Sequence, residues 1–493
     1  MFDLQKFQFN KLLQIISSIF IILGIVFRFY HQFIEWSFNG DEVNLGLDII
    51  NHSYKNLFHP FQSRQSAPPL FLLIEKLTSE VSKPFVSLKI INFLASCASI
   101  FLFNRILKKS LDQTTQIILI ALFCFNPFII SNSLTLKQYS VDLMMGLIAV
   151  NYYLNKKPIF KIFLFFCFFC WISNVGLFFS ASFLIFNIIK TISEHGLGNF
   201  FTWKRAKKLF PYLLAPIPYL IFYFWFINQP GAENMKSYMV YYWEGSFLPL
   251  NLSIFKWIAI QGKVIYYFFY STYWLVGIPM LVLFIFSLSI IFRKKQRIFQ
   301  ELPFAIILVY MITVGVHVFL SALKMYPFSD RLFLYMVPGI YLVTGIGIEQ
   351  LYRKLIVKWN SRLNKMLILI FPIIAIALYI TYLPKKSNDV YGLIGYVNST
   401  NKTIFFTPKA KQTALQWLEF TKYEGQNTTK IIHSKAWDTI NNIKPDLLIA
   451  VQSKKFGHTK NFTTPEPEIE KLIKQEKIVL CHRLDGYVIY KFK

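Results

Sequence analysis

The chain has 493 residues, of which 55% are hydrophobic and 18% aromatic, and its formal net charge is +27. A single soluble core cannot bury this much apolar side chain, so the composition excludes a water-soluble globular protein and indicates a chain that crosses a membrane several times. The positive charge needs no nucleic-acid partner, because basic residues beside membrane spans orient the chain and meet anionic lipid head groups.

Apolar windows recur from residue 12 to residue 383. A helix needs about 20 mostly apolar residues to cross the hydrocarbon region, and this length predicts an α-helical polytopic membrane protein with about 11 spans. The first window lacks the short apolar core and small-residue cleavage site of a signal peptide, so we expect it to be retained. The predicted spans lie near residues 12–30, 86–104, 114–131, 139–155, 159–172, 174–190, 209–228, 274–292, 302–320, 332–350 and 366–383.

Lys and Arg gather in alternate connections between these spans. Cytoplasmic loops carry an excess of these residues, so the bias predicts a cytoplasmic N-terminus and, after an odd number of spans, an extracytoplasmic C-terminal part. The same bias predicts that residues 159–190 cross twice as two short helices that turn near Ser173 and Asn174. The basic connections contain Lys6 and Lys11; Arg105, Lys108 and Lys109; Lys156, Lys157 and Lys161; Lys190, Lys204, Arg205, Lys207 and Lys208; Arg293, Lys294, Lys295 and Arg297; and Arg353, Lys354, Lys358, Arg362 and Lys365.

Two long stretches between spans fall on the predicted outer side. The first, residues 31–85, contains Asp41 and Glu42 side by side. Its segment from Glu42 to Ile50 has apolar residues at helical spacing, which predicts a helix on the membrane surface. The second, residues 229–273, is rich in Tyr and Trp. Such rings suit the interfacial belt of a membrane protein, and their faces also suit sugar rings and prenyl chains, so both interpretations stay open.

The composition changes near residue 384, where long apolar runs end and Lys, Asn and Thr increase. About 110 residues can fold as a small α/β domain. We therefore predict a transmembrane domain over 1–383 and an extracytoplasmic α/β domain over 384–493, which could serve as a lid, an acceptor-binding module or a structural cap. Cys481 is the one cysteine outside the apolar spans, so no intramolecular disulfide is expected there. Strands are expected at 403–407, 430–433, 446–451, 477–480 and 486–492, and helices at 409–422 and 466–476.

Polar groups at the edges of spans need a partner or a task, because a charge at the centre of a transmembrane helix costs about 2.5–3.5 kcal/mol and one near the interface costs less. Asp41 and Glu42 lie in the first outer loop, Lys137 and Tyr139 begin the fourth span, and Arg331 begins the tenth. The three segments share the outer side, which predicts one site there. Each residue also has an ordinary interpretation, as a solvated turn, a snorkelling lysine or a local ion pair.

Several short motifs follow one another between residues 10 and 350. In their order and membrane side they resemble the glycosyltransferase C superfamily, in particular the bacterial polyprenyl-phosphate-sugar-dependent transferases related to protein O-mannosyltransferase and the lipid A aminoarabinose transferase. The tail contains no motif of that family. The motifs are Gly40-Asp41-Glu42, Ser66-Ala67-Pro68-Pro69-Leu70-Phe71, Leu136-Lys137-Gln138-Tyr139-Ser140-Val141-Asp142, Trp171-Ile172-Ser173 and Tyr326-Pro327-Phe328-Ser329-Asp330-Arg331.

The resemblance implies an enzyme that moves a sugar from a polyprenyl-phosphate donor to an acceptor hydroxyl of a glycan, lipid or protein on the outer face of a bacterial plasma membrane. Asp41 is then the candidate base, with Glu42 as a second carboxylate. Lys137 and Arg331 are candidates to hold the phosphate, and Tyr139 to donate a hydrogen bond to it. This layout implies a single displacement that inverts the anomeric centre. A divalent cation on the two carboxylates is the family-type alternative, but without a further acidic cluster we favour metal independence and expect no cofactor.

Two other classes fit a polytopic basic chain. A flippase or transporter of lipid-linked oligosaccharide is expected to show internal repeats with polar residues at mid-membrane, whereas this sequence shows no repeat and its candidate charges cluster at one face. A polysaccharide polymerase or ligase would share the lipid-linked substrate and move whole chains instead of single sugars.

Overall fold

The computed structural model describes residues 2–35, 38, 40–82, 87–196, 202–268, 274–293, 301–356, 373, 377, 404–406, 431–432, 447–451, 467–484 and 487–492. The chain divides into two compact units, which are described separately. The first comprises Met1–Gln32, Ser53–Glu75 and Lys89–Pro384, and the second comprises Phe33–His52, Lys76–Leu88 and Lys385–Lys493.

The chain is an integral membrane protein. Among the described residues, seven helices are long and apolar enough to cross a membrane, or eight if the bent pair α6 and α7 forms one span. Two more of the predicted spans correspond to the shorter helices α8 and α9, of 16 and 14 residues. The predicted span at 366–383 lies outside the described residues, apart from residues 373 and 377.

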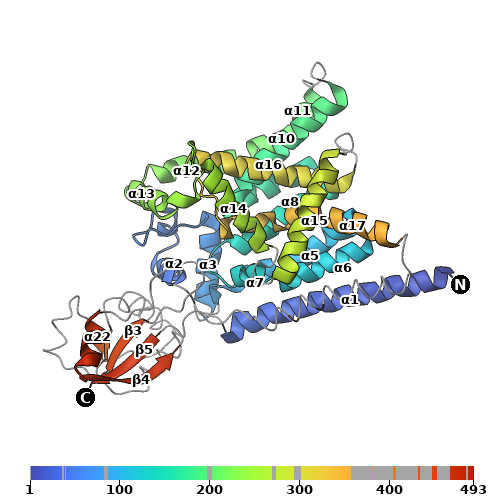
Figure 1. Ribbon diagram of the computed structural model, residues 1–493. Helices are drawn as coiled ribbons and strands as arrows, with labels where there is room; N and C mark the ends of the chain where they lie inside the picture. The colour runs from blue at the N-terminus through green and yellow to red at the C-terminus, as the bar shows by residue number, and fades with distance from the viewer. Residues whose placement is uncertain are drawn as a thin grey trace. The chain divides into compact units, whose positions relative to one another are not determined.

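Helices make up the described part of the first unit (Figure 1). Apolar side chains from α5, α6, α8, α10, α16 and α17 fill its core. The helices are α1 (Phe2–Tyr30), α5 (Ile90–Ser110), α6 (Gln113–Phe125), α7 (Pro127–Ser133), α8 (Tyr139–Leu154), α9 (Ile159–Ile172), α10 (Val175–His195), α11 (Trp203–Leu214), α12 (Ile217–Ile227), α13 (Ala232–Tyr242), α14 (Ile254–Phe268), α15 (Trp274–Arg293), α16 (Leu302–Ala322) and α17 (Val337–Ile356), with the short helices η1 (His31–Glu35), η2 (Asn56–Phe58), η4 (Glu244–Ser246) and η6 (Arg331–Met336).

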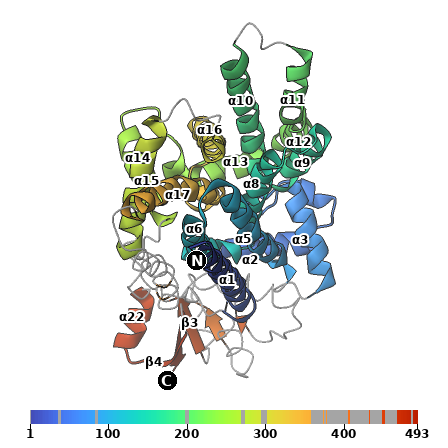
Figure 2. The ribbon, with the colours of Figure 1, turned by 90° about the vertical axis from the view of Figure 1, so that its right-hand side faces the viewer.

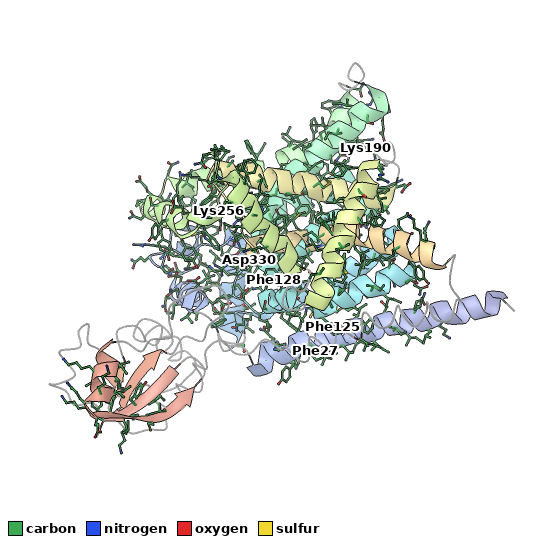
Figure 3. All side chains as sticks on the ribbon, in the orientation of Figure 1. Phe27, Phe125, Phe128, Lys190, Lys256 and Asp330 are labelled. Carbon is green, nitrogen blue, oxygen red and sulfur yellow. The ribbon has the colours of Figure 1, made fainter. Side chains whose placement is uncertain are left out.

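Helix α1 packs along α6 (Figure 1). A buried arginine of α1 joins it to the C-terminal end of α6. The Arg28 side chain donates to Ser96 Oγ at 2.7 Å and to the Cys124 carbonyl at 2.9 Å. The last carbonyl groups of a helix have no partner within that helix, so Arg28 caps α6 where the chain bends by 49° into α7. Figure 3 shows Phe27 beside Phe125 at the same junction, with ring centroids 5.9 Å apart.

The apolar stretch 159–190 forms two helices, α9 and α10, with the predicted turn at Ser173 and Asn174. The first is short as expected, but the second has 21 residues, so the prediction of two short helices is wrong for α10. A Cβ on Gly176 would lie 2.7 Å from the α9 backbone, so the close approach at this turn requires glycine. Figure 2 shows α10 continuing beside α11, against which it packs.

The second unit contains the helix predicted from the spacing of residues 42–50, which is α2 (Gly40–Asn51). Val43, Leu45 and Ile49 of α2 are buried. Lys76 of α3 (Pro69–Val81) donates to the Ile50 carbonyl at 2.8 Å. The helix is therefore confirmed, and its position on the membrane surface stays a prediction.

The described C-terminal residues form a five-stranded sheet of order β2-β1-β3-β5-β4. β1 pairs in parallel with β2 and β3, whereas β5 pairs antiparallel with β3 and β4. Ile469 of the helix α22, which lies between β3 and β4 in the sequence, packs on Leu448 and Ile478. The expected helix at 409–422 lies outside the described residues, and the domain boundaries stay predictions. The elements are β1 (Ile404–Phe406), β2 (Ile431–Ile432), β3 (Leu447–Val451), α22 (Pro467–Lys474), β4 (Ile478–Leu484) and β5 (Tyr487–Phe492).

Candidate functional site

Arg331 lies where three segments of the first unit meet. It begins η6, and its backbone N–H donates to the Asp330 carboxylate at 2.7 Å. Its guanidinium carbon lies 5.0 Å from the ring centroid of Trp243, before η4, and 6.0 Å from that of Tyr139, the first residue of α8. Aromatic faces attract a guanidinium and orient it. The structure therefore brings Tyr139 and Arg331 together, as predicted, and adds Trp243, which sequence reasoning had assigned only to an aromatic-rich loop.

Lys137 lies directly before α8 on the same segment as Tyr139. The Tyr139 backbone N–H donates to the Lys137 carbonyl at 2.9 Å, and the Tyr139 side chain is buried. The ammonium of Lys137 donates to Gln65 Oε1 at 2.7 Å. The segment that precedes α3 therefore contributes an amide oxygen that accepts a hydrogen bond from Lys137.

A buried histidine fixes the loop that carries Arg331. His317 of α16 is fully buried, with Nε2 3.0 Å from the Pro327 carbonyl and Nδ1 2.9 Å from the Tyr335 hydroxyl. A carbonyl only accepts, so Nε2 carries a proton, and in a neutral imidazole Nδ1 then accepts from the Tyr335 hydroxyl. Both nitrogens are thus used by a neutral imidazole. Sequence reasoning missed His317, although a histidine inside an apolar span is a recognisable signal.

Further hydrogen bonds connect this loop to the segment of Trp243. Phe328 N–H donates to the Ser246 carbonyl at 2.9 Å. Ser321 Oγ, at the end of α16, accepts from the Leu248 N–H at 3.0 Å and donates to the Ser246 carbonyl at 3.3 Å. The backbone on both sides of the Arg331–Trp243 contact is therefore fixed.

A buried carboxylate lies one turn into α8. Asp142 is 2% exposed and accepts a hydrogen bond from Ser173 at the turn between α9 and α10. The hydroxyl of Tyr326 is buried and has no hydrogen-bond partner among the described residues. Burial raises the pKa of Tyr326 well above its ordinary value, and the negative charge of Asp142 adds to this effect. Asp142 and Tyr326 both belong to the motifs that carried the resemblance.

Asp41 and Glu42 occupy the first turn of α2, where the helix dipole favours negative charge. Glu42 is 1% exposed, whereas Asp41 is partly exposed. Both belong to the second unit, and their position relative to Lys137, Tyr139 and Arg331 stays a prediction. In the described ranges no group of three or more His, Cys, Asp or Glu side chains is arranged to hold a metal ion.

An open apolar groove of about 460 Å³ lies on the first unit. One wall comes from η2 and α3 and the other from α9. The Phe222 ring of α12 lies 5.9 Å from Phe58 and 5.1 Å from Trp171, so α12 supports both walls. The lining residues are Phe58, Leu70, Leu73, Cys167, Phe168 and Trp171.

The amino-acid sequence matches no protein-family model and no curated protein. Among solved structures, the chain is similar to ArnT from Cupriavidus metallidurans. It is 10% identical to ArnT bound to undecaprenyl phosphate, covering 96% of this chain and 97% of that one, with a TM-score of 0.54. The apo ArnT structure gives 9% identity, the same coverage and a TM-score of 0.53. An Archaeoglobus fulgidus oligosaccharyltransferase tethered to an acceptor peptide is 10% identical over 88% of this chain and 69% of that chain, with a TM-score of 0.44, too low to indicate a shared fold.

The similarity to ArnT extends over nearly the whole of both chains, so it concerns the complete arrangement of helices and not a single motif. The chain therefore shares its fold with the ArnT structures, and the helical membrane fold expected from the sequence is confirmed.

Proposed function

We propose that this chain is a membrane glycosyltransferase that moves a sugar from a polyprenyl-phosphate donor to an acceptor hydroxyl. The observation that carries the proposal is that the Arg331 guanidinium carbon lies 6.0 Å from the Tyr139 ring centroid and 5.0 Å from that of Trp243. An arginine oriented in this way presents planar donors to a phosphate. The shared fold adds support, because the ArnT structure contains undecaprenyl phosphate, a lipid of this kind.

The chemistry needs a cationic pocket for the leaving phosphate and a base for the acceptor hydroxyl. Arg331 and Lys137 stabilise the negative charge that develops on the phosphate as the glycosidic bond breaks, and Tyr139 donates a hydrogen bond. Asp41 takes the acceptor proton as its oxygen attacks the anomeric carbon, and Glu42 supports Asp41. The attack opposes the leaving group, so the anomeric configuration inverts. We propose that no metal takes part, and a rate unchanged by EDTA is the expected result.

The apolar groove provides a place for the prenyl chain. Leu70 and Trp171 line it. Gln65, which binds Lys137, lies five residues before Leu70, and Ser173, which binds Asp142, lies two residues after Trp171. The segments that form the groove therefore continue into the polar site. Burying prenyl methylene groups there would contribute about 0.8 kcal/mol for each CH₂.

Transfer is tested with purified protein in lipid vesicles and labelled polyprenyl-phosphate hexose or pentose. The acceptor source is an envelope extract from a strain that lacks the protein, because the unmodified glycan, lipid or protein acceptor remains there. Transfer of one sugar supports the proposal. Transfer of whole chains would indicate a polymerase or ligase, and passage of intact lipid across the bilayer without a covalent product would indicate a flippase.

The base assignment has its own test. Asp41→Asn should abolish transfer and leave binding of the polyprenyl phosphate unchanged, because the amide keeps the shape of the side chain and cannot take a proton. A fully active Asp41→Asn enzyme would remove Asp41 as the base.

We place the site on the outer face of a bacterial plasma membrane, with a cytoplasmic N-terminus. Topology mapping that puts residues 41 and 331 on opposite sides would contradict this arrangement.

A further inference from the structure

A row of aromatic rings leads from Arg331 along the end of α13. The Tyr242 and Trp243 ring centroids are 5.1 Å apart, and the Tyr238 and Tyr242 rings are stacked with centroids 6.0 Å apart. Tyr238, Tyr242 and Trp243 form what is called the aromatic row below. Its inner end touches Arg331, and the Arg64 guanidinium carbon lies 5.2 Å from Tyr238 at the outer end. Two cations therefore bracket three rings.

The aromatic row is accessible. Tyr242 is 51% exposed, and Arg64 is also exposed. Arg64 has a backbone φ of 61°, in the left-handed region that a non-glycine residue seldom adopts, and its N–H donates to the Phe61 carbonyl at 3.1 Å. This turn costs conformational energy, and it places a cation of the first outer loop against the second outer loop.

We infer that the aromatic row binds the acceptor, and that the acceptor is a saccharide with an acidic substituent. This inference rests on the proposed function and identifies the substrate class of that site. The C–H faces of a sugar ring pack on aromatic faces, and Arg64 pairs with a phosphate or carboxylate on the sugar. Glu244 is exposed beside Trp243, and the Asp330 carboxylate accepts from the Arg331 N–H, so negative charge lies at the inner end of the row and Arg64 at the outer end is the cation that meets the acidic group.

Continuity with Arg331 supports this assignment. The leaving phosphate of the donor meets Arg331 on one side, and the aromatic row begins on the same guanidinium through Trp243. A sugar stacked on Tyr242 is therefore one residue away from Trp243, the ring that orients the Arg331 guanidinium. An interfacial belt would place aromatic rings at a common depth, but it would not require arginines at both ends of one stacked row.

The neighbouring Tyr241 provides a matched control. It is 79% exposed on the same helix and is not among the described ring contacts of the aromatic row. Removing either ring exposes no core, so Tyr242→Ala and Tyr241→Ala should both fold. An interfacial role would be affected by both substitutions to a similar degree, whereas a sugar-binding role requires only Tyr242.

The probes are glucose 6-phosphate and glucose, added to detergent-solubilised protein saturated with undecaprenyl phosphate so that the donor phosphate site is occupied. Saturation-transfer difference NMR measures sugar binding. We expect glucose 6-phosphate to bind more tightly than glucose, Tyr242→Ala to weaken its binding about three- to tenfold, and Tyr242→Phe and Tyr241→Ala to have little effect. Arg64→Gln should remove the preference for the phosphorylated sugar.

Equal weakening by Tyr242→Ala and Tyr241→Ala, or no binding of either sugar to protein that has bound undecaprenyl phosphate, would overturn the inference. Protein that folds but does not bind undecaprenyl phosphate would contradict the proposed function itself. The two failures are therefore distinguishable in the same experiment.

Discussion

Replacing Arg331 by Gln removes the charge that the aromatic rings orient and keeps a side chain of similar length. The guanidinium carbon lies 5.0 Å from Trp243 and 6.0 Å from Tyr139, so it is held in place before any substrate binds. A hydrogen bond to a charged group contributes about 1.5–3 kcal/mol, which corresponds to a loss of about 10- to 150-fold in kcat/KM. Arg331→Lys keeps the charge and loses the planar fork, so we expect a loss of about two- to fivefold.

The assay measures initial rates of transfer from labelled polyprenyl-phosphate sugar at several donor concentrations. Lys324→Gln is the matched control, because Lys324 is an exposed cation in the same connection between α16 and η6. It should change kcat/KM by less than about twofold, as surface charges of this kind contribute about 1 kcal/mol or less. If Arg331→Gln retained kcat/KM within a factor of two of the wild type, Arg331 would not hold the leaving phosphate.

Three further substitutions test the packing around the site. Ser173→Ala removes the hydroxyl that donates to the buried Asp142 and should cost about 1–3 kcal/mol, seen as a lower Tm; an unchanged Tm would mean that the carboxylate has another sufficient partner. His317→Phe leaves two buried polar groups without their partner and should lower both Tm and kcat, whereas a lower Tm with normal kcat would show that the histidine only stabilises the fold. Gly339→Ala places a Cβ 2.6 Å from the Tyr310 ring and should lower the stability by about 1–3 kcal/mol. A Cβ on Gly315 would meet nothing within 4 Å, so Gly315→Ala should leave the stability unchanged. Equal Tm values for the two variants would contradict the packing of α16 on α17.

Much of the helical framework could be predicted from local patterns. Hydropathy placed spans where α1, α5, α10 and α16 are found, because a long apolar run has few alternatives to a buried or lipid-facing helix. The strand expected at 446–451 is β3 (Leu447–Val451), since a run of β-branched and aliphatic residues favours a buried strand. The lengths of the helices were less predictable. Helix α10 is longer than expected because basic residues can continue a helix past the membrane edge.

The site was only partly predictable. The proximity of Tyr139 and Arg331 could be predicted because polar groups at the ends of apolar spans are conspicuous, whereas the roles of Lys137, Tyr139 and Arg331 stay predictions. The contact between Trp243 and Arg331 could not be predicted, because the two residues lie far apart in the sequence. The same holds for His317, whose hydrogen bonds form only after α16 packs against η6. Spacing in a sequence gives the face of one helix, whereas these contacts depend on how helices pack together.

Arg28 has a consequence for how the protein is made. Its partner carbonyl at Cys124 lies 96 residues later in the chain. At about 5–20 residues per second, the ribosome needs several seconds to reach that carbonyl. Until then the first helix carries a charge whose transfer into lipid is unfavourable. Biogenesis must therefore delay release of the first helix into the bilayer, or shield Arg28 beside the insertion machinery, until α6 emerges.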